Sequence, residues 1–284
     1  MALFIPNQNK IILIKHIAVA LDCSPHSLAS LTAAAELARL LHADLTGIFV
    51  EDINLFRMAE LPFSHEIRMY TAETEKIDPL WLEHSVKAQA KTAETDLQRI
   101  AKQFMVHYSF RVARGIVPAE VIAASLDADL LVLGRSGRSP SCHKKLGSTA
   151  KKALAEGKKP LLLMQPGFSA KKSPVLVLYD ESEGANLALS TAMSLIESGN
   201  TLHLLIFGET YKKSLEIEGE LSKKISLPSS VVEYHHLPIK NGKTIVRHIR
   251  TIGSGLLVLS DQMKLSKDLV HELIKEIDYP VFLV

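Results

Sequence analysis

Cysteine and tryptophan are almost absent from this sequence, which has only two cysteines, Cys23 and Cys142, and a single tryptophan in 284 residues. Two distant cysteines without C-x-x-C spacing form neither a disulfide framework nor a paired-cysteine zinc site. We therefore expect both to be reduced thiols. Among the twelve histidines no two have the spacing of metal ligands on a shared face, and His235 and His236 are interpreted as one inward and one outward residue of a strand. No metal site built from protein side chains is predicted.

An excess of charge of one sign is also missing, because 33 basic residues face 31 acidic ones and the net charge is +2. Neither nucleic acid nor an anionic membrane is therefore an expected partner. Long hydrophobic runs are absent too. The most apolar stretch near the N-terminus, residues 11–21, is interrupted by Lys15 and His16 and is shorter than the ~20 residues of a membrane helix. With no pattern typical of an export signal, we expect a cytoplasmic protein.

What the sequence does contain is a series of short apolar runs, rich in Val, Ile and Leu, separated by segments with helical periodicity. Continuous hydrophobicity is typical of strands that are buried on both faces, as in a parallel sheet covered by helices. Strands alternating with helices predict a doubly wound α/β fold. The segment 27–41 illustrates the helices, because it places Leu31, Ala34, Ala35, Ala38 and Leu41 on one face. The runs are residues 17–21, 45–50, 106–112, 130–133 and 161–164, then 175–179, 202–207, 231–235, 256–259 and 281–284.

The two halves of the chain repeat each other. IAVALDCS at 17–24 corresponds to VLVLYDES at 175–182, and LTGIFVED at 45–52 corresponds to LHLLIFGE at 202–209. DADLLVLG at 127–134 corresponds in the same order to GSGLLVLS. A duplicated domain explains these coincidences, with predicted domains at 1–167 and 174–284.

The first half is longer than the second because of residues 53–80, which follow its second predicted strand. Such a long connection is typical of a lid, an interface or an extra helix, and we expect it to pack over the sheet edge.

The motif with most chemical content follows the fourth predicted strand and reads VLGRSGRSPSCHKKLGSTAKKAL. Its spacing is G-x2-G-x9-G-S, with Gly134 and Gly137 first and Gly147 and Ser148 last. We expect the first two glycines to adopt positive φ and to let the backbone approach a phosphate chain. Gly147, Ser148 and Thr149 are predicted at a helix N-terminus, which favours anions. A merely structural tight turn is the alternative, and the spacing is neither that of a Walker A loop nor G-x-G-x-x-G.

This loop, together with HIAVALDCS, GIFVED and KKPLLL, resembles the nucleotide loop of ATP-binding universal stress proteins. The resemblance covers residues 15–165 well and 174–284 more weakly. It implies two tandem Rossmann-like domains of the adenine nucleotide alpha hydrolase type, each a five-stranded parallel sheet with helices on both faces. It also implies ATP as the ligand, with Mg²⁺ or Mn²⁺ arriving with it.

Carried over residue by residue, the resemblance implies that Asp22 lies near the ribose or adenine, that Val50 offers its backbone to the adenine, and that Ala20 lines the same pocket. Gly134, Arg135, Ser136, Gly137 and Arg138 would surround the ribose and phosphates, and Gly147, Ser148 and Thr149 would hold the phosphates. In the second half Ser260 and Met263 replace Gly134 and Gly137, although Asp180 is retained. We therefore predict one nucleotide per chain, in the first half.

No set of catalytic residues is recognisable, so a nucleotide-dependent stress-response module with at most slow hydrolysis is the favoured hypothesis. Two alternatives stay open: a slow ATPase or adenylyl-transferring enzyme, and a small-molecule or lipid carrier with a vestigial loop. The protein partner is unknown. We expect the halves to form an internal pseudo-dimer through residues 161–164 and 281–284, with a homodimer as a further possibility. Cys23 and Cys142 are interpreted as incidental thiols rather than oxidant sensors.

Overall fold

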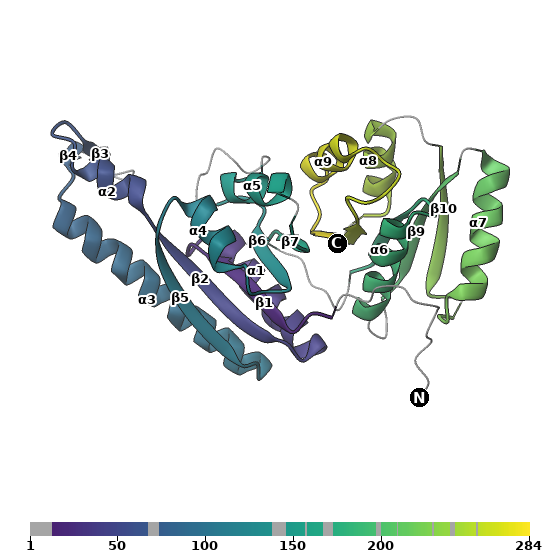
Figure 1. The fold of residues 1–284 in the computed structure, drawn as a ribbon, viewed down its shortest axis with the longest axis horizontal. Coiled ribbons are helices and arrows are strands. Elements are labelled where there is room, and N and C mark those ends of the chain that lie inside the picture. Colours follow the sequence, from purple (N-terminus) through teal and green to yellow (C-terminus); the bar gives the residue numbers. More distant parts are fainter. Residues whose placement is uncertain are drawn as a thin grey trace.

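A computed structural model of the chain describes residues 13–67, 74–137, 146–156, 158–166, 173–196, 200–208, 210–228, 230–238, 242–253 and 255–284. The predicted alternation of strands and helices is present in both halves (Figure 1). The elements of the first half are β1 (His16–Leu21), α1 (Pro25–Leu41), β2 (Asp44–Asp52), α2 (Ile53–Ala59), β3 (His65–Ile67), β4 (Thr74–Lys76), α3 (Pro79–Phe104), β5 (Tyr108–Gly115), α4 (Val117–Ala124), β6 (Leu130–Gly134), α5 (Ser148–Glu156) and β7 (Leu161–Met164).

The second half has the same order of elements without the additional helix and hairpin. Its elements are β8 (Val175–Tyr179), α6 (Glu183–Leu195), β9 (Leu202–Gly208), α7 (Tyr211–Lys224), β10 (Val232–Pro238), α8 (Gly242–Thr251), β11 (Leu256–Leu259), α9 (Lys267–Glu276) and β12 (Val281–Leu283). Among the residues described, no helix combines the length and the apolar character that crossing a bilayer requires.

A single ten-stranded sheet runs through the molecule in the order β10-β9-β8-β11-β12-β7-β6-β1-β2-β5. Within each half all neighbouring strands are parallel. The halves meet where β12 pairs with β7 antiparallel, with Leu162 opposite Phe282 at the centre. The two segments that the sequence suggested as the contact therefore lie side by side.

The strand order reverses direction once in each half. In the first half this happens between β1 and β6, because β2 and β5 continue on one side of β1 while β6 and β7 lie on the other. In open α/β sheets, the crevice at the carboxyl ends of the strands beside such a reversal is where ligands bind. The residues that follow β1 and β6 are therefore the ones expected to bind a ligand.

Helix α1 shows how the sequence positions these strand ends. Ser24 caps the helix by accepting a hydrogen bond from the backbone N–H of Ser27, and Pro25 fits the first turn because it needs no N–H there. The predicted apolar face is buried except at its end, where Leu41 is partly exposed. The buried members of that face are Leu31, Ala34, Ala35 and Ala38. Small alanines on this face allow the helix to lie close to the sheet.

The duplication is also visible in the turn that follows the first strand of each half. Cys23 and Glu181 both have a left-handed backbone with φ of 61°. The preceding aspartate accepts a hydrogen bond from the serine N–H two residues on, at 2.9 Å for Asp22 and 3.1 Å for Asp180. In both halves that serine caps the next helix. The sequence repeat D-x-S is therefore a repeat of local structure.

The additional segment at 53–80 contains α2 and the β3–β4 hairpin, which Figure 1 shows at the end of the molecule farthest from the second half. Helix α2 packs on α3 and contacts the edge strand β5, as expected. The Arg114 guanidinium of β5 lies 4.6 Å from the ring centre of Phe56 and pairs with Glu51 at 2.7 Å. By contrast, Phe63 is 88% exposed.

Candidate functional site

The ends of β1, β2 and β6 bring predicted site residues together at the carboxyl edge of the sheet. Leu21 is paired with Phe49, so the register places Asp22 beside Val50. On the other side Val19 is paired with Val132, so the same extension places Leu21 beside Gly134. Asp22 therefore lies at the strand reversal, with β2 on one side and the start of the glycine loop on the other.

The ends of strands β1 and β2 are partly exposed on one face of the sheet. Ala20 and Asp22 lie on the same face of β1. Val50 of β2 lies on that face too, because the register places it beside Asp22. All three are partly exposed, whereas the intervening Leu21 and the adjacent Phe49 are buried. This face of the strand ends is therefore the one that a ligand could reach from solvent.

Gly137 and Gly147 reach the same region from the loop after β6. A Cβ on Gly137 would lie 3.2 Å from Asp22 Oδ2, and a Cβ on Gly147 would lie 3.7 Å from the backbone nitrogen of Gly137. The backbone N–H of Gly147 donates to the carbonyl of Arg135 at 2.9 Å, which ties the two ends of the loop together. Gly147 was expected to hold phosphate, but this N–H is used to close the loop.

Helix α5 begins immediately after Gly147, as predicted, with Ser148 exposed and Thr149 partly exposed. The first N–H groups of a helix have no intrahelical acceptor and favour an anion together with the helix dipole. The start of α5 is thus the part of the loop that is suited to phosphate. Arg138, the remaining predicted residue, lies outside the described residues, as do Cys142 and the basic residues at 143–145.

The two glycines at the start of the loop differ from the expectation. Neither Gly134 nor Gly137 has a positive φ; among the described glycines that conformation is found at Gly253. At Gly134 an added Cβ would lie 3.1 Å from His26 Cβ and 3.2 Å from the carbonyl oxygen of Ser136. The close packing of α1 on β6 therefore favours glycine at position 134, and the expected positive φ is wrong.

His26 is a site residue that the sequence reasoning missed. Its Nε2 is 3.0 Å from Ser136 Oγ, so the hydroxyl of the predicted ligand residue Ser136 is hydrogen-bonded to the first turn of α1. Ser136 is 4% exposed. The sequence carried no signal for this pair, because a histidine two residues after a helix cap has no fixed partner.

Arg135 is the clearest correction. Its side chain is 4% exposed and donates to the carbonyls of Ile274 and Lys275 at 2.7 and 2.8 Å, in the last turn of α9. Its backbone N–H donates to the carbonyl of Met164 at 2.8 Å. Burial lowers the pKa of the guanidinium, and the nearby Asp278 acts in the opposite direction. The Arg135 side chain therefore links the halves instead of facing the expected nucleotide site.

The equivalent region of the second half is filled. Leu178, Asp180 and Phe207 occupy the positions of Ala20, Asp22 and Val50, and all are buried. The carboxylate of Asp180 is fully engaged: Oδ1 accepts from Ser182, and Oδ2 accepts from the backbone N–H of Lys264 at 2.6 Å.

Met263 takes the place of Gly137 and is also buried, at 8% exposure. Larger side chains and a chain folded over the aspartate leave this face of the second half closed.

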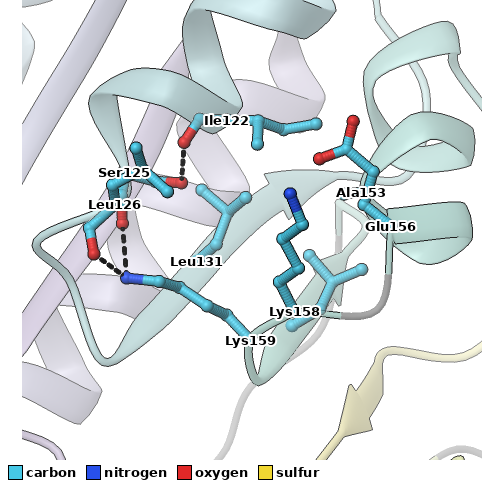
Figure 2. A pocket seen from close by; sticks show the side chains of 9 residues that line it. Ile122, Ser125, Leu126, Leu131, Ala153, Glu156, Lys158 and Lys159 are labelled. Atoms are coloured by element: carbon cyan, nitrogen blue, oxygen red, sulfur yellow. Dashed lines mark hydrogen bonds between the residues drawn. The ribbon is translucent and has the colours of Figure 1, made fainter.

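Among the described residues, cavities are found away from the partly exposed face of β1 and β2. Figure 2 shows the smaller one, of about 30 Å³, at the opposite edge of the sheet, where Lys159 donates to the carbonyls of Ser125 and Leu126. Its size is that of one or two water molecules. A larger one, of about 240 Å³, lies between the start of α1 and α3 and is lined by Cys23, whose thiol donates to the carbonyl of Gln89 at 3.3 Å.

The fold and the strand-end geometry define a two-part Rossmann-like α/β protein with helices on both sides of a mostly parallel sheet. The sequence matches the universal stress protein family over residues 13–165. Because this match covers more than half of the 284 residues, the chain belongs to the universal stress protein family.

Solved structures agree with this fold over the whole chain. A universal stress protein from Archaeoglobus fulgidus DSM 4304 has a TM-score of 0.68 at 16% identity, covering 94% of this chain and 97% of that one. A functionally unknown protein from Pseudomonas aeruginosa PAO1 has a TM-score of 0.63 at 14% identity, covering 96% and 93%. No curated protein matched the sequence.

Proposed function

We propose that this universal stress protein binds one ATP, carried with Mg²⁺ or Mn²⁺, in its first half, and that the bound state acts as a regulatory signal in a stress response. The adenine and ribose would lie on the open face formed by Ala20, Asp22 and Val50. The phosphates would lie between Gly137 and the first turn of α5. Ser148 and Thr149 would supply hydroxyl and N–H donors there.

The observation that carries the proposal is the meeting of Asp22, Gly137 and Gly147 at the strand reversal. These residues come from two segments far apart in the sequence, and among the described atoms Asp22 Oδ2 is the nearest to a Cβ placed on Gly137, at 3.2 Å. Backbone that is free of side chains beside a helix N-terminus is what phosphate recognition requires. A purely structural tight turn would not need the adjacent face of β1 and β2 to remain partly open.

A contrast within the chain supports binding to one half only. The second half has the same topology and retains the aspartate, but Leu178, Phe207 and Met263 fill the space. The first half therefore differs from its own internal copy at the positions that the proposed ligand would touch.

The first prediction tests the phosphate loop with Gly137→Val. The added side chain would collide with Asp22 and occupy the phosphate path, so we expect the ATP affinity measured by isothermal calorimetry to fall at least tenfold, about 1.4 kcal/mol. Gly219→Val is the matched control, because an added Cβ at this glycine of α7 meets nothing within 4 Å. Equal affinities of wild type and Gly137→Val would contradict the proposal. Phosphate release in the same samples reports hydrolysis separately.

A further inference from the structure

A cluster of three histidines and one glutamate lies in the second half, on the face of β9 and β10 that is turned towards α8. His203 is opposite Glu233 in the register of the two strands, and His235 lies two residues farther along β10 on the same face. His248 reaches the cluster from α8, with its Nε2 3.4 Å from His235 Nδ1. The cluster is therefore assembled from three elements, β9, β10 and α8.

This arrangement corrects the interpretation of His235 and His236. His236 points to the opposite face, where it pairs with Glu218 of α7 at 2.8 Å. Both histidines are partly buried, at 21% and 19% side-chain exposure, so neither is an outward residue. Helix α7 packs on the face of β10 that carries His236, and His248 of α8 reaches His235 on the other face.

Three donor atoms in the cluster converge. His203 Nδ1 is 3.0 Å from His235 Nε2 and 3.4 Å from Glu233 Oε2, and His235 Nε2 is 4.0 Å from the same oxygen. Two donors bound to one tetrahedral zinc ion at about 2.0–2.1 Å lie roughly 3.3 Å apart. The three observed distances lie on both sides of this value. Small adjustments of the side chains would therefore let one ion contact all three atoms.

The protonation of the cluster suits a cation. His203 Nδ1 and His235 Nε2 share one hydrogen bond, so at least one of the two facing nitrogens holds a free lone pair. Neutral imidazoles offer the lone pairs that a metal needs. In the absence of an ion, one of the two facing nitrogens must carry the proton of their hydrogen bond, and a metal ion would replace that proton.

His248 occupies the position of an outer-shell partner. If His235 binds an ion through Nε2, its Nδ1 carries a proton and donates it to His248 Nε2. Such hydrogen bonds orient metal-bound histidines, and their loss typically weakens metal affinity 10- to 100-fold. The exposed side of the cluster is formed by Glu233, whose side chain is 59% exposed, so solvent can supply a fourth ligand.

We infer that His203 Nδ1, His235 Nε2 and Glu233 Oε2 form a site for one divalent transition-metal ion of the Zn²⁺ type. Two imidazoles and one carboxylate are ligands that Zn²⁺ accepts in a four-coordinate site completed by water. The cluster lies near the amino ends of β9 and β10, at the edge of the sheet opposite Asp180. It is thus separate from both the proposed ATP site and its closed counterpart.

The second prediction concerns zinc binding to the full chain, prepared without a histidine tag, chelators or nucleotide. Calorimetric titration with Zn²⁺ is expected to give one site per chain. We expect His203→Asn and Glu233→Gln each to weaken this site at least tenfold, and His248→Leu to weaken it about tenfold or more. Co²⁺ in place of Zn²⁺ should give the intense visible absorption of a four-coordinate ion.

His236→Gln is the matched control, since it removes a neighbouring histidine on the opposite face and should leave the affinity unchanged. If His203→Asn fails to fold, the zinc affinity of Glu233→Gln provides the test, because that exposed side chain is not part of the core. Absence of zinc binding by the wild-type chain overturns the inference. The same holds if His203→Asn and Glu233→Gln bind zinc as tightly as the wild type.

Discussion

At the scale of single residues, the two halves share one helix–strand contact in which a glycine faces a larger residue. The glycine is on the strand side in the first half and on the helix in the second. In the first half Gly134 ends β6 and faces His26 of α1; in the second half the residue after β11 is Ser260, and it faces Gly184 of α6. The register makes these positions equivalent. The helix and the strand can approach closely only if one of the two partners is glycine, and each half places that glycine on a different partner.

The third prediction follows from this exchange. A Cβ at Gly184 would lie 2.6 Å from the backbone carbon of Gln262, which cannot give way as a flexible side chain can. We expect Gly184→Ala to lower the free energy of unfolding by roughly 1–3 kcal/mol, measured by urea denaturation.

Gly219→Ala is the control for Gly184→Ala, because it adds a methyl group to open space within helix α7. It is expected to raise stability by roughly 0.4–1 kcal/mol. If Gly184→Ala were as stable as the wild type, the steric account of this contact would be wrong.

Sequence reasoning placed the residues around Asp22 better than it described how they act. The D-x-S repeat and the glycine spacing correctly indicated which strand ends meet, because parallel strands bring their carboxyl ends to one edge. The direction of the Arg135 side chain was misjudged, and the contacts of His26 with Gly134 and Ser136 were missed, since each depends on a tertiary partner. No local sequence pattern predicts such tertiary contacts.

At the scale of elements, the quality of the strand predictions depended on position in the sheet. The central strands were located almost to the residue, as for the runs 161–164 and 256–259. The ends of the two edge strands were placed one to three residues out of position: β5 covers Tyr108–Gly115 instead of 106–112, and β10 covers Val232–Pro238 instead of 231–235. Edge strands expose part of their surface, so a continuous apolar run does not mark their ends.

The fourth prediction concerns the link between the loop after β6 and helix α9. Arg135→Met removes two hydrogen bonds to carbonyls at the helix C-terminus and leaves them without these donors. We expect a loss of about 1–3 kcal/mol in unfolding free energy, with faster amide hydrogen exchange in α9 and β12.

The control for this link is Arg99→Met, which breaks an exposed pair with Asp96 and should cost no more than about 1 kcal/mol. Unchanged exchange in α9 in the Arg135 variant would show that the contact does not hold the halves together.

At the scale of the whole molecule, duplication has produced one continuous sheet with two unequal halves. The antiparallel pairing of β7 with β12 joins them, and Arg135 adds a second contact close by. Arg135, at the start of the loop after β6, therefore joins the first half to α9 of the second. This continuity gives the proposed ATP site a physical route to the half that carries the histidine cluster.

The two halves share one fold but carry different candidate binding residues. The first half leaves the face of Ala20, Asp22 and Val50 partly open, and the second half closes the equivalent face while placing His203, Glu233 and His235 at its opposite edge. The central claim is that this difference limits nucleotide binding to the first half.

The fifth prediction is the stoichiometry of ATP binding, and it tests that claim most directly. Calorimetric titration of the intact chain with ATP and Mg²⁺ is expected to give one site per chain. Asp22→Asn should weaken that site, whereas Asp180→Asn should leave its affinity unaltered in protein that remains folded. A stoichiometry near two, or no binding at all, would contradict the account.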